Sequence, residues 1–156
     1  MSTLAIPIDV GIGIVLRETP PTDPFPRSQT SRTIELLITR RPGTTVFGGY
    51  WELPGGKAES GETPDDCVRR ELSEEVGVSV DLLGSLPEVV YTYPHGTVRL
   101  HPRLCRLTPG SPPPANLHVA DHRWCPIDRL EDFAFPPANE SIIAALRQRL
   151  AAGLDL

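Results

Sequence analysis

The segment GGKAESGETPDDCVRRELSEEVGV, residues 55–78, constrains the fold of this chain more than any other stretch. It contains Thr63, a preferred N-cap residue, followed by Pro64, which suits the first turn of a helix. Two aspartates follow at the positive end of the helix dipole, and Gly77 suits the C-terminal exit. The segment therefore predicts a helix from about Pro64 to Val76.

This predicted helix carries two stripes of side chains spaced three and four residues apart. One stripe is apolar, with Val68, Leu72 and Val76, and the other is acidic, with Glu71, Glu74 and Glu75. Like charges at that spacing repel each other by roughly 1–3 kcal/mol per pair, depending on how water screens them. A bidentate pair with Arg70 would offset the repulsion, and so would a divalent cation that prefers oxygen ligands, Mg²⁺ or Mn²⁺. A solvated acidic helix face is the alternative interpretation.

Strands are expected on both sides of this helix. The apolar residues from Ile6 to Leu16 fall at every second position, which predicts a strand with one buried face. The proline-rich stretch 17–32 is typical of an exposed loop, and residues 34–39 of the returning strand. Two further strands are expected within 91–107, and their alternating side chains are Val98, Leu100 and Leu104 on one face and Arg99, His101 and Arg103 on the other.

The last third of the chain predicts a loop at 109–116, a short strand at 122–127 and a helix at 140–152. Asn139 is placed to cap this last helix, and Gly153 to end it. Groups of strands separated and followed by helices favour an α/β fold in which a mixed sheet lies between helices. The length of 156 residues suits one domain spanning residues 1–156, and we expect a monomer.

Charge and cysteine content exclude several functional classes. A net charge of −5 argues against broad binding to duplex nucleic acid or to an acidic membrane surface. Three cysteines far apart in sequence suggest neither a disulfide framework nor a zinc site, and a reducing cytoplasmic setting is expected. The N-terminal apolar run contains Pro7 and Asp9 and lacks a basic region, so we expect neither a signal peptide nor a membrane anchor.

The glycines and charges of residues 56–78 follow one fixed spacing. Gly56, five residues, Glu62, seven residues and then RELxEExGV from Arg70 to Val78 match every position of the pattern G-x5-E-x7-R-E-U-x-E-E-x-G-U, where U is apolar. At a usage of roughly 6% per residue type, chance would produce this match on the order of once in 10⁹ starts. The sequence thus resembles the Nudix hydrolases. The strings WELPGGK and FPPANE make it similar to the MutT-like pyrophosphohydrolases, over most of residues 34–150.

The resemblance implies a Nudix α/β/α sandwich and a metal-dependent enzyme. By similarity, Glu71, Glu74 and Glu75 are metal ligands together with the carbonyl of Gly55 or Gly56, while Arg70 and Glu62 orient them. The metal is expected to be Mg²⁺, or Mn²⁺, because divalent ions screen a triphosphate and lower the pKa of an attacking water. Arg41 and Lys57 are expected to contact the phosphates or the base, although a solvated strand end explains Arg40 and Arg41 equally well.

The base pocket is expected from residues outside the acidic segment. The resemblance implies that Asn139 in FPPANE reads the edge of a purine, since an amide both donates and accepts hydrogen bonds. Capping of the last helix is the competing role for this side chain. Tyr91 and Tyr93 would line the pocket or belong to the strand core. Leu53 stands where MutT-like chains usually have a phenylalanine, which removes one aromatic wall.

A second departure concerns His118, which stands six residues before Trp124, where MutT-like chains usually carry a glutamate that reaches the metal. His118 would act as the general base or as a metal ligand, or it is a surface histidine. The expected function is hydrolysis of a nucleoside triphosphate, with 8-oxo-dGTP as the leading substrate, to the monophosphate and pyrophosphate. A pyrimidine nucleoside triphosphate is the alternative substrate, and a non-catalytic base-recognition module is the alternative class of protein.

Overall fold

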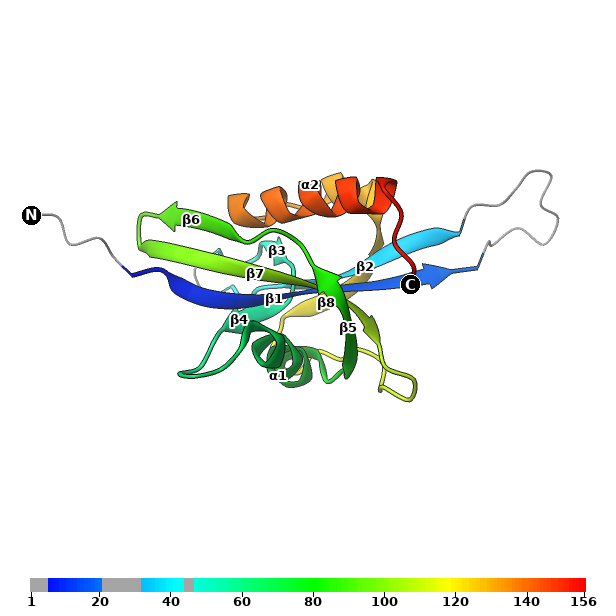
Figure 1. Cartoon of the computed structure of the whole chain (residues 1–156), viewed down its shortest axis with the longest axis horizontal. Coiled ribbons are helices and arrows are strands. Elements are labelled where there is room, and N and C mark those ends of the chain that lie inside the picture. Colours follow the sequence, from blue (N-terminus) through cyan, green and yellow to red (C-terminus); the bar gives the residue numbers. More distant parts are fainter. Residues whose placement is uncertain (1–5, 21–31, 44–46) are drawn as a thin grey trace, which may run out of the picture.

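The computed structural model describes residues 6–20, 32–43 and 47–156. A mixed sheet runs along the long axis of the molecule, with one long helix on each face (Figure 1). The strands are β1 (Ile8–Thr19), β2 (Thr33–Arg40), β3 (Trp51–Glu52), β4 (Gly55–Lys57), β5 (Val80–Ser85), β6 (Val89–Tyr93), β7 (Gly96–Leu107) and β8 (Asp121–Pro126). The helices are α1 (Pro64–Val76), a 3-10 helix η1 (Ile127–Asp132) and α2 (Pro137–Ala151). The expected α/β sandwich is confirmed.

The main path of the sheet has the order β3-β2-β1-β7-β5, with β4 paired to β1, β6 to β7 and β8 to β2. β1 and β7 are parallel, with Ile8 opposite Val98 and Val15 opposite Cys105, whereas the other pairs are antiparallel. β4 lies antiparallel to β1 with Gly56 opposite Gly11. This pairing places the glycine loop of residues 55–57 directly beside α1, which follows it in sequence.

The prediction for the first strand is correct in type and wrong in burial. β1 begins at Ile8, and Ile6 is 90% exposed. Both faces of the strand are buried from Gly11 to Leu16, because a helix covers each face of the sheet. The predicted loop 17–32 starts later than expected, since β1 continues to Thr19. Its interior, residues 21–31, lies outside the described residues.

α1 packs close to the sheet because β1 presents glycines to it. A Cβ atom at Gly11 would lie 2.8 Å from Cys67 Sγ, and one at Gly13 would lie 2.9 Å from Leu72 Cδ1. α1 has the predicted bounds: Thr63 Oγ1 accepts a hydrogen bond from the Asp66 amide, and Gly77 ends the helix at φ 72°. The predicted apolar stripe of α1 is buried.

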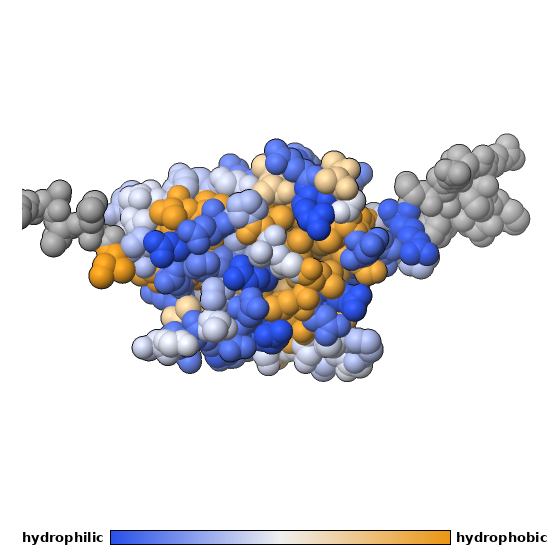
Figure 2. Space-filling view, viewed as in Figure 1, coloured by the Kyte–Doolittle hydropathy of each residue, from blue (hydrophilic) through white to orange (hydrophobic). Residues whose placement is uncertain are grey.

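Two apolar cores lie on opposite faces of the sheet. The core under α1 includes Val15, Leu37, Val68, Leu72 and Val76. The larger core under α2 includes Ile14, Leu36, Leu104, Ile142 and Leu146. On the face seen in Figure 2, hydrophilic side chains predominate, and apolar ones gather mainly between the two helical layers. No helix within residues 6–20, 32–43 and 47–156 is long and apolar enough to cross a membrane.

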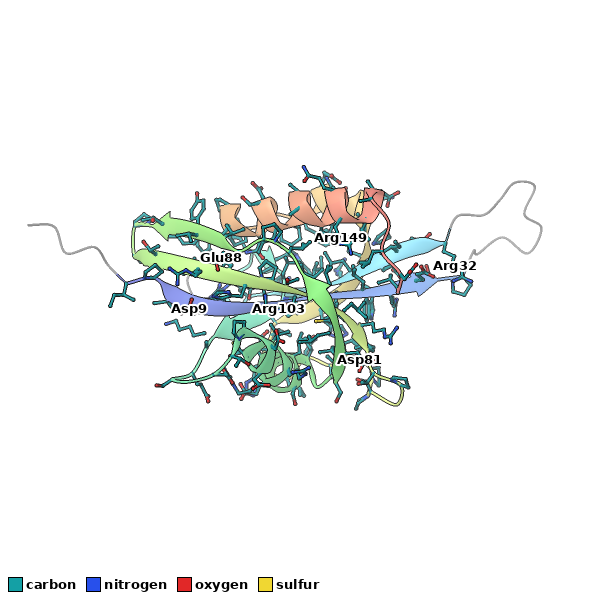
Figure 3. The ribbon with its side chains drawn as sticks, in the orientation of Figure 1. Asp9, Arg32, Asp81, Glu88, Arg103 and Arg149 are labelled. Carbon is teal, nitrogen blue, oxygen red and sulfur yellow. The ribbon has the colours of Figure 1, made fainter. Side chains whose placement is uncertain are left out.

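The predicted division of β7 between two faces is confirmed. Val98, Leu100 and Leu104 pack toward α2. On the opposite face, Arg103 reaches toward α1 (Figure 3), and its Nε lies 2.6 Å from Asp65 Oδ1 in the first turn of that helix. The predicted strand at 122–127 appears as β8, one residue earlier. The short strands β3 and β4, and strand β5, were not predicted.

The prediction that Asn139 caps the last helix is wrong. α2 begins at Pro137, three residues earlier than expected, and Pro136 is its N-cap residue without any side-chain capping bond. Asn139 lies inside the first turn and is buried, with 7% of its surface exposed. Proline suits the first helical positions because it lacks an amide that would need a partner there. The side chain of Asn139 is therefore free of the capping role.

Candidate active site

The glycine loop and α1 hold the acidic cluster together. A Cβ atom at Gly56 would lie only 2.4 Å from the carboxyl carbon of Glu71, so this carboxylate packs directly against the backbone. A Cβ atom at Gly55 would lie 2.0 Å from the Gly11 carbonyl oxygen of β1. Both positions therefore require glycine, and the loop carbonyls stay next to the acidic face of α1.

Arg70 binds most of the carboxylates around it. Its Nε and Nη2 each donate to Glu62 at 2.8 Å, so the bidentate pair forms with a carboxylate that precedes α1 and not, as expected, with one of the acidic stripe. Its Nη1 donates to Glu71 at 2.9 Å and to Glu74 at 3.2 Å, and Nη2 also donates to the Lys57 carbonyl at 3.0 Å. The hydrogen bonds from Arg70 lower the pKa of Glu62 to about 2. Arg70 thus ties the helix to the loop that precedes it.

Glu75 lies apart from this network. Its Oε2 is buried and has no hydrogen-bond partner among the described residues. Burial, reinforced by the nearby charges of Glu52 and Glu71, raises the pKa of Glu75 to about 8. Burial also raises the pKa of Glu71. Burial therefore disfavours the ionised forms of Glu71 and Glu75 when no cation is bound.

Glu52 on β3 is a site residue that the sequence analysis missed. Burial raises its pKa to about 7, although Arg41 Nη1 donates to its Oε2 at 3.0 Å and opposes the rise. Strand pairing places Glu52 opposite Thr39 and brings Arg41, just past the end of β2, alongside it. The available signal was a carboxylate between two large apolar residues, Trp51 and Leu53, immediately before Pro-Gly-Gly.

A central cavity of about 370 Å³ joins the acidic cluster to the start of α2. It brings together most of the residues that the sequence singled out: Arg41, Leu53, Gly55, Gly56, Lys57, Glu71, Glu75, Tyr93 and Asn139. Glu52, Phe47 and His95 also line it, together with apolar residues of β1, β7 and α2. The cavity is not lined by Glu62, Arg70 or Glu74. These three residues form ion pairs with one another instead, Arg70 with Glu62 and with Glu74.

Asn139 is anchored at the α2 end of the central cavity. Its Oδ1 accepts a hydrogen bond of 2.9 Å from the buried amide of Leu53. The side-chain amino group is then the part of Asn139 left to donate into the cavity. Tyr93 lies beside it, since the Ala138 amide donates to the Tyr93 hydroxyl at 3.4 Å. Tyr91 packs against Tyr93 with ring centroids 4.6 Å apart and belongs to the core margin.

The loop that carries His118 binds the last turn of α1 through its backbone. The amides of Leu117 and His118 both donate to the Glu75 carbonyl at 3.1 Å. The His118 side chain is exposed, and it is not among the described residues that line the central cavity. The loop thus supplies hydrogen-bond donors to a carbonyl in the last turn of α1. It brings the backbone of His118, rather than its imidazole, close to that helix.

The donor set suits a hard divalent cation. Carboxylate and carbonyl oxygens are the ligands that Mg²⁺ prefers, and the unpartnered Oε2 of Glu75 is a buried oxygen that a cation would satisfy. Glu71 lies against Gly56 in the same cavity. Glu74 points instead to Arg70 and is half-exposed. In the part of the chain that the structure describes, no three acidic, histidine or cysteine side chains are already gathered around one point.

Comparison with known proteins agrees with this geometry. A family model described as NUDIX domain matches residues 30–145. The 8-oxo-dGTP diphosphatase of Escherichia coli K12 is 35% identical over 114 residues, covering 73% of this chain and 87% of that protein. A putative 8-oxo-dGTP diphosphatase 2 of Mycobacterium tuberculosis H37Rv is 33% identical over 123 residues, covering 76% and 84%.

Solved structures share the fold at lower sequence identity. The solution structure of the E. coli ORF135 protein has a TM-score of 0.70 at 21% identity, covering 95% of this chain and 94% of that one. The crystal structure of the MutT protein from Methanosarcina mazei has a TM-score of 0.71 at 18% identity, covering 95% and 99%. The matched family model, the relatives above 30% identity and the shared fold together show that the chain belongs to the Nudix hydrolase family.

Proposed function

We propose that this protein hydrolyses a nucleoside triphosphate to the monophosphate and pyrophosphate in a Mg²⁺-dependent reaction, with an oxidised purine nucleotide such as 8-oxo-dGTP as the leading substrate. The observation that carries the proposal is the central cavity, which joins the α1 carboxylates to an amide donor at the start of α2. Two relatives above 30% identity are named for the 8-oxo-dGTP reaction. The three cysteines are buried and unpaired, which suits the reducing cytoplasm.

The acidic end of the central cavity would hold the metal and the phosphates. Glu71, Glu75 and the loop carbonyls are the proposed ligands, and Glu74 would join them by leaving Arg70. A bound divalent ion screens the phosphate charges and lowers the pKa of water. Arg41 and Lys57 line the same cavity and supply positive charge to the phosphates. Arg70 and Glu62 would act by positioning the helix carboxylates and the loop.

The α2 end would hold the base. Because Asn139 Oδ1 is engaged by the Leu53 amide, the amino group of Asn139 would donate to a carbonyl oxygen on the base edge. Glu52 lines the same cavity, where Arg41 Nη1 donates to its Oε2 at 3.0 Å, so it would hold Arg41 in place between the base and the phosphates.

The test is a panel of nucleoside triphosphates with Mg²⁺: 8-oxo-dGTP, dGTP, dATP and dCTP. Release of pyrophosphate, rather than phosphate, with the highest kcat/KM for 8-oxo-dGTP is expected. A preference for dCTP would transfer the proposal to the pyrimidine alternative. Full turnover in excess EDTA, or no turnover of any nucleotide, would refute it.

A further inference from the structure

Three aromatic rings line the central cavity beside the start of α2. Phe47 comes from the segment between β2 and β3, Tyr93 from the end of β6, and His95 from the turn that follows it. The rings of Tyr93 and His95 are parallel within 7°, with centroids 5.2 Å apart. The ring of Phe47 meets both edge-on, at 5.2 Å from Tyr93 and 6.4 Å from His95. Together they form one aromatic surface.

The apolar core does not fully bury this aromatic surface. His95 is exposed, and Phe47 and Tyr93 are only half-buried. The Tyr93 hydroxyl is tied to the Ala138 amide at 3.4 Å, which sets the ring next to Asn139. Contiguous aromatic area left open inside a cavity is a feature of a binding site rather than of packing.

The backbone at Phe47 adopts a conformation that residues other than glycine rarely take. Phe47 has φ 57°, and it is the one residue other than glycine with positive φ in the described part of the chain. The Tyr50 amide, which donates to the Phe47 carbonyl at 3.0 Å, closes the turn. A bulky side chain in the left-handed region costs free energy, and such outliers cluster where a ligand is held. The strain sets the Phe47 ring against Tyr93 and His95.

We propose that Phe47, Tyr93 and His95 form the surface on which the nucleobase stacks, and that Phe47 and His95 bias the site toward purines. The inference rests on the proposed function and names residues that select its substrate. Stacking on aromatic rings is available to every base, but it grows with ring area and so favours the bicyclic purines. The amino group of Asn139 would read the edge of the base while the rings hold its face.

The test uses Phe47→Gly, His95→Ala and, as a matched control, Tyr50→Ala. Glycine adopts the φ of position 47 without strain, so the turn still closes. His95 is exposed, so its removal leaves the fold intact. The ring of Tyr50 meets that of Phe47 edge-on, with centroids 5.6 Å apart, and Tyr50 is not among the described residues that line the central cavity. Each variant is measured for kcat and KM with 8-oxo-dGTP, dGTP and dCTP, and for the Kd of dGMP and dCMP in EDTA.

Phe47→Gly and His95→Ala are expected to raise KM and Kd for the purine nucleotides by between about five- and a hundredfold, the range for loss of one base-aromatic contact. The rise for dCTP and dCMP should be smaller. Values of kcat should change by less than about threefold, because the rings touch the base and not the reacting phosphates. Tyr50→Ala should resemble the wild type.

Unchanged purine KM and Kd in both variants would overturn the inference, and so would an equal rise for purines and pyrimidines. An effect of Tyr50→Ala as large as that of Phe47→Gly would show local packing instead of base contact. Failure of the proposed function looks different, since the wild type would then release no pyrophosphate from any triphosphate. The Kd values for dGMP and dCMP are measured without turnover and test the aromatic surface separately.

Discussion

Replacing Glu75 with glutamine should make the metal-free protein more stable at alkaline pH while removing its activity. The Oε2 atom of Glu75 is buried and has no hydrogen-bond partner among the described residues, and a backbone hydrogen bond from Gly55 only partly offsets the effect of burial on this carboxyl group. Glutamine keeps the shape of the side chain and removes the charge. A loss of kcat of at least about a hundredfold is expected, the scale seen when electrostatic stabilisation of a reacting group is removed.

The size of the stability gain follows from the pKa of Glu75, which rises from 4.5 to about 8 in the folded protein. The folded state therefore binds this proton more tightly than the unfolded chain does. The corresponding stability is present below pH 4.5 and is lost as the pH rises toward 8. At about 1.4 kcal/mol per pKa unit the whole rise amounts to about 5 kcal/mol, and water at the mouth of the cavity reduces the expected gain to roughly 2–4 kcal/mol.

The assay is urea unfolding in EDTA at pH values from 5 to 9. The free energy of unfolding of the wild type should fall across this range, and that of Glu75→Gln should fall less and exceed the wild type at pH 9. We attribute the pH dependence of the free energy of unfolding that remains in Glu75→Gln to Glu52 and Glu71, because burial also raises their pKa values. Addition of Mg²⁺ should stabilise the wild type at pH 9 and have little effect on the variant.

Glu74→Gln is the matched control, because Glu74 is half-exposed and ion-paired to Arg70. An exposed pair of this kind contributes about 0.3–0.5 kcal/mol, so this variant should keep the wild-type dependence on pH. The reasoning fails if Glu75→Gln is less stable than the wild type at pH 9, or if both variants change the dependence on pH equally.

Three further predictions test the fold and the site. Asn139→Ala should lower the free energy of unfolding by about 1–3 kcal/mol and weaken base discrimination, because it leaves a buried amide unpaired. Asn139→Asp keeps an acceptor for that amide and should weaken discrimination with a smaller loss of stability, measured by melting temperature. Gly13→Ala should destabilise the protein by about 1–3 kcal/mol through contact with Leu72 at 2.9 Å, whereas Gly43→Ala, with open space around it, should be neutral in the same unfolding assay. His118→Ala should keep the fall in kcat/KM that is expected when the pH is lowered. Loss of this fall in the variant would identify His118 as the general base.

Local chemistry was sufficient to predict α1 to the residue. The cap at Thr63, the proline after it and the left-handed glycine at position 77 are signals that act within a few residues of the chain. The acidic pattern and the family resemblance came from the same segment, and the family is confirmed. The alternating residues of β1 predicted a strand for the same reason, because side-chain period depends only on the local backbone.

The tertiary structure alone decided that β1 is buried on both faces and which residues distant in sequence meet. β1 is buried on both sides because α1 and α2 cover opposite faces of the sheet, and one strand does not encode its neighbours. The bond between the Leu53 amide and Asn139 joins residues 86 positions apart, which no local pattern contains. The same holds for Glu52, whose raised pKa depends on burial beside a cavity lined by β1, β7, α1 and α2. Burial and long-range charge proximity are properties of the assembled sheet, and they determine which of the predicted carboxylates has a buried oxygen without a hydrogen-bond partner among the described residues.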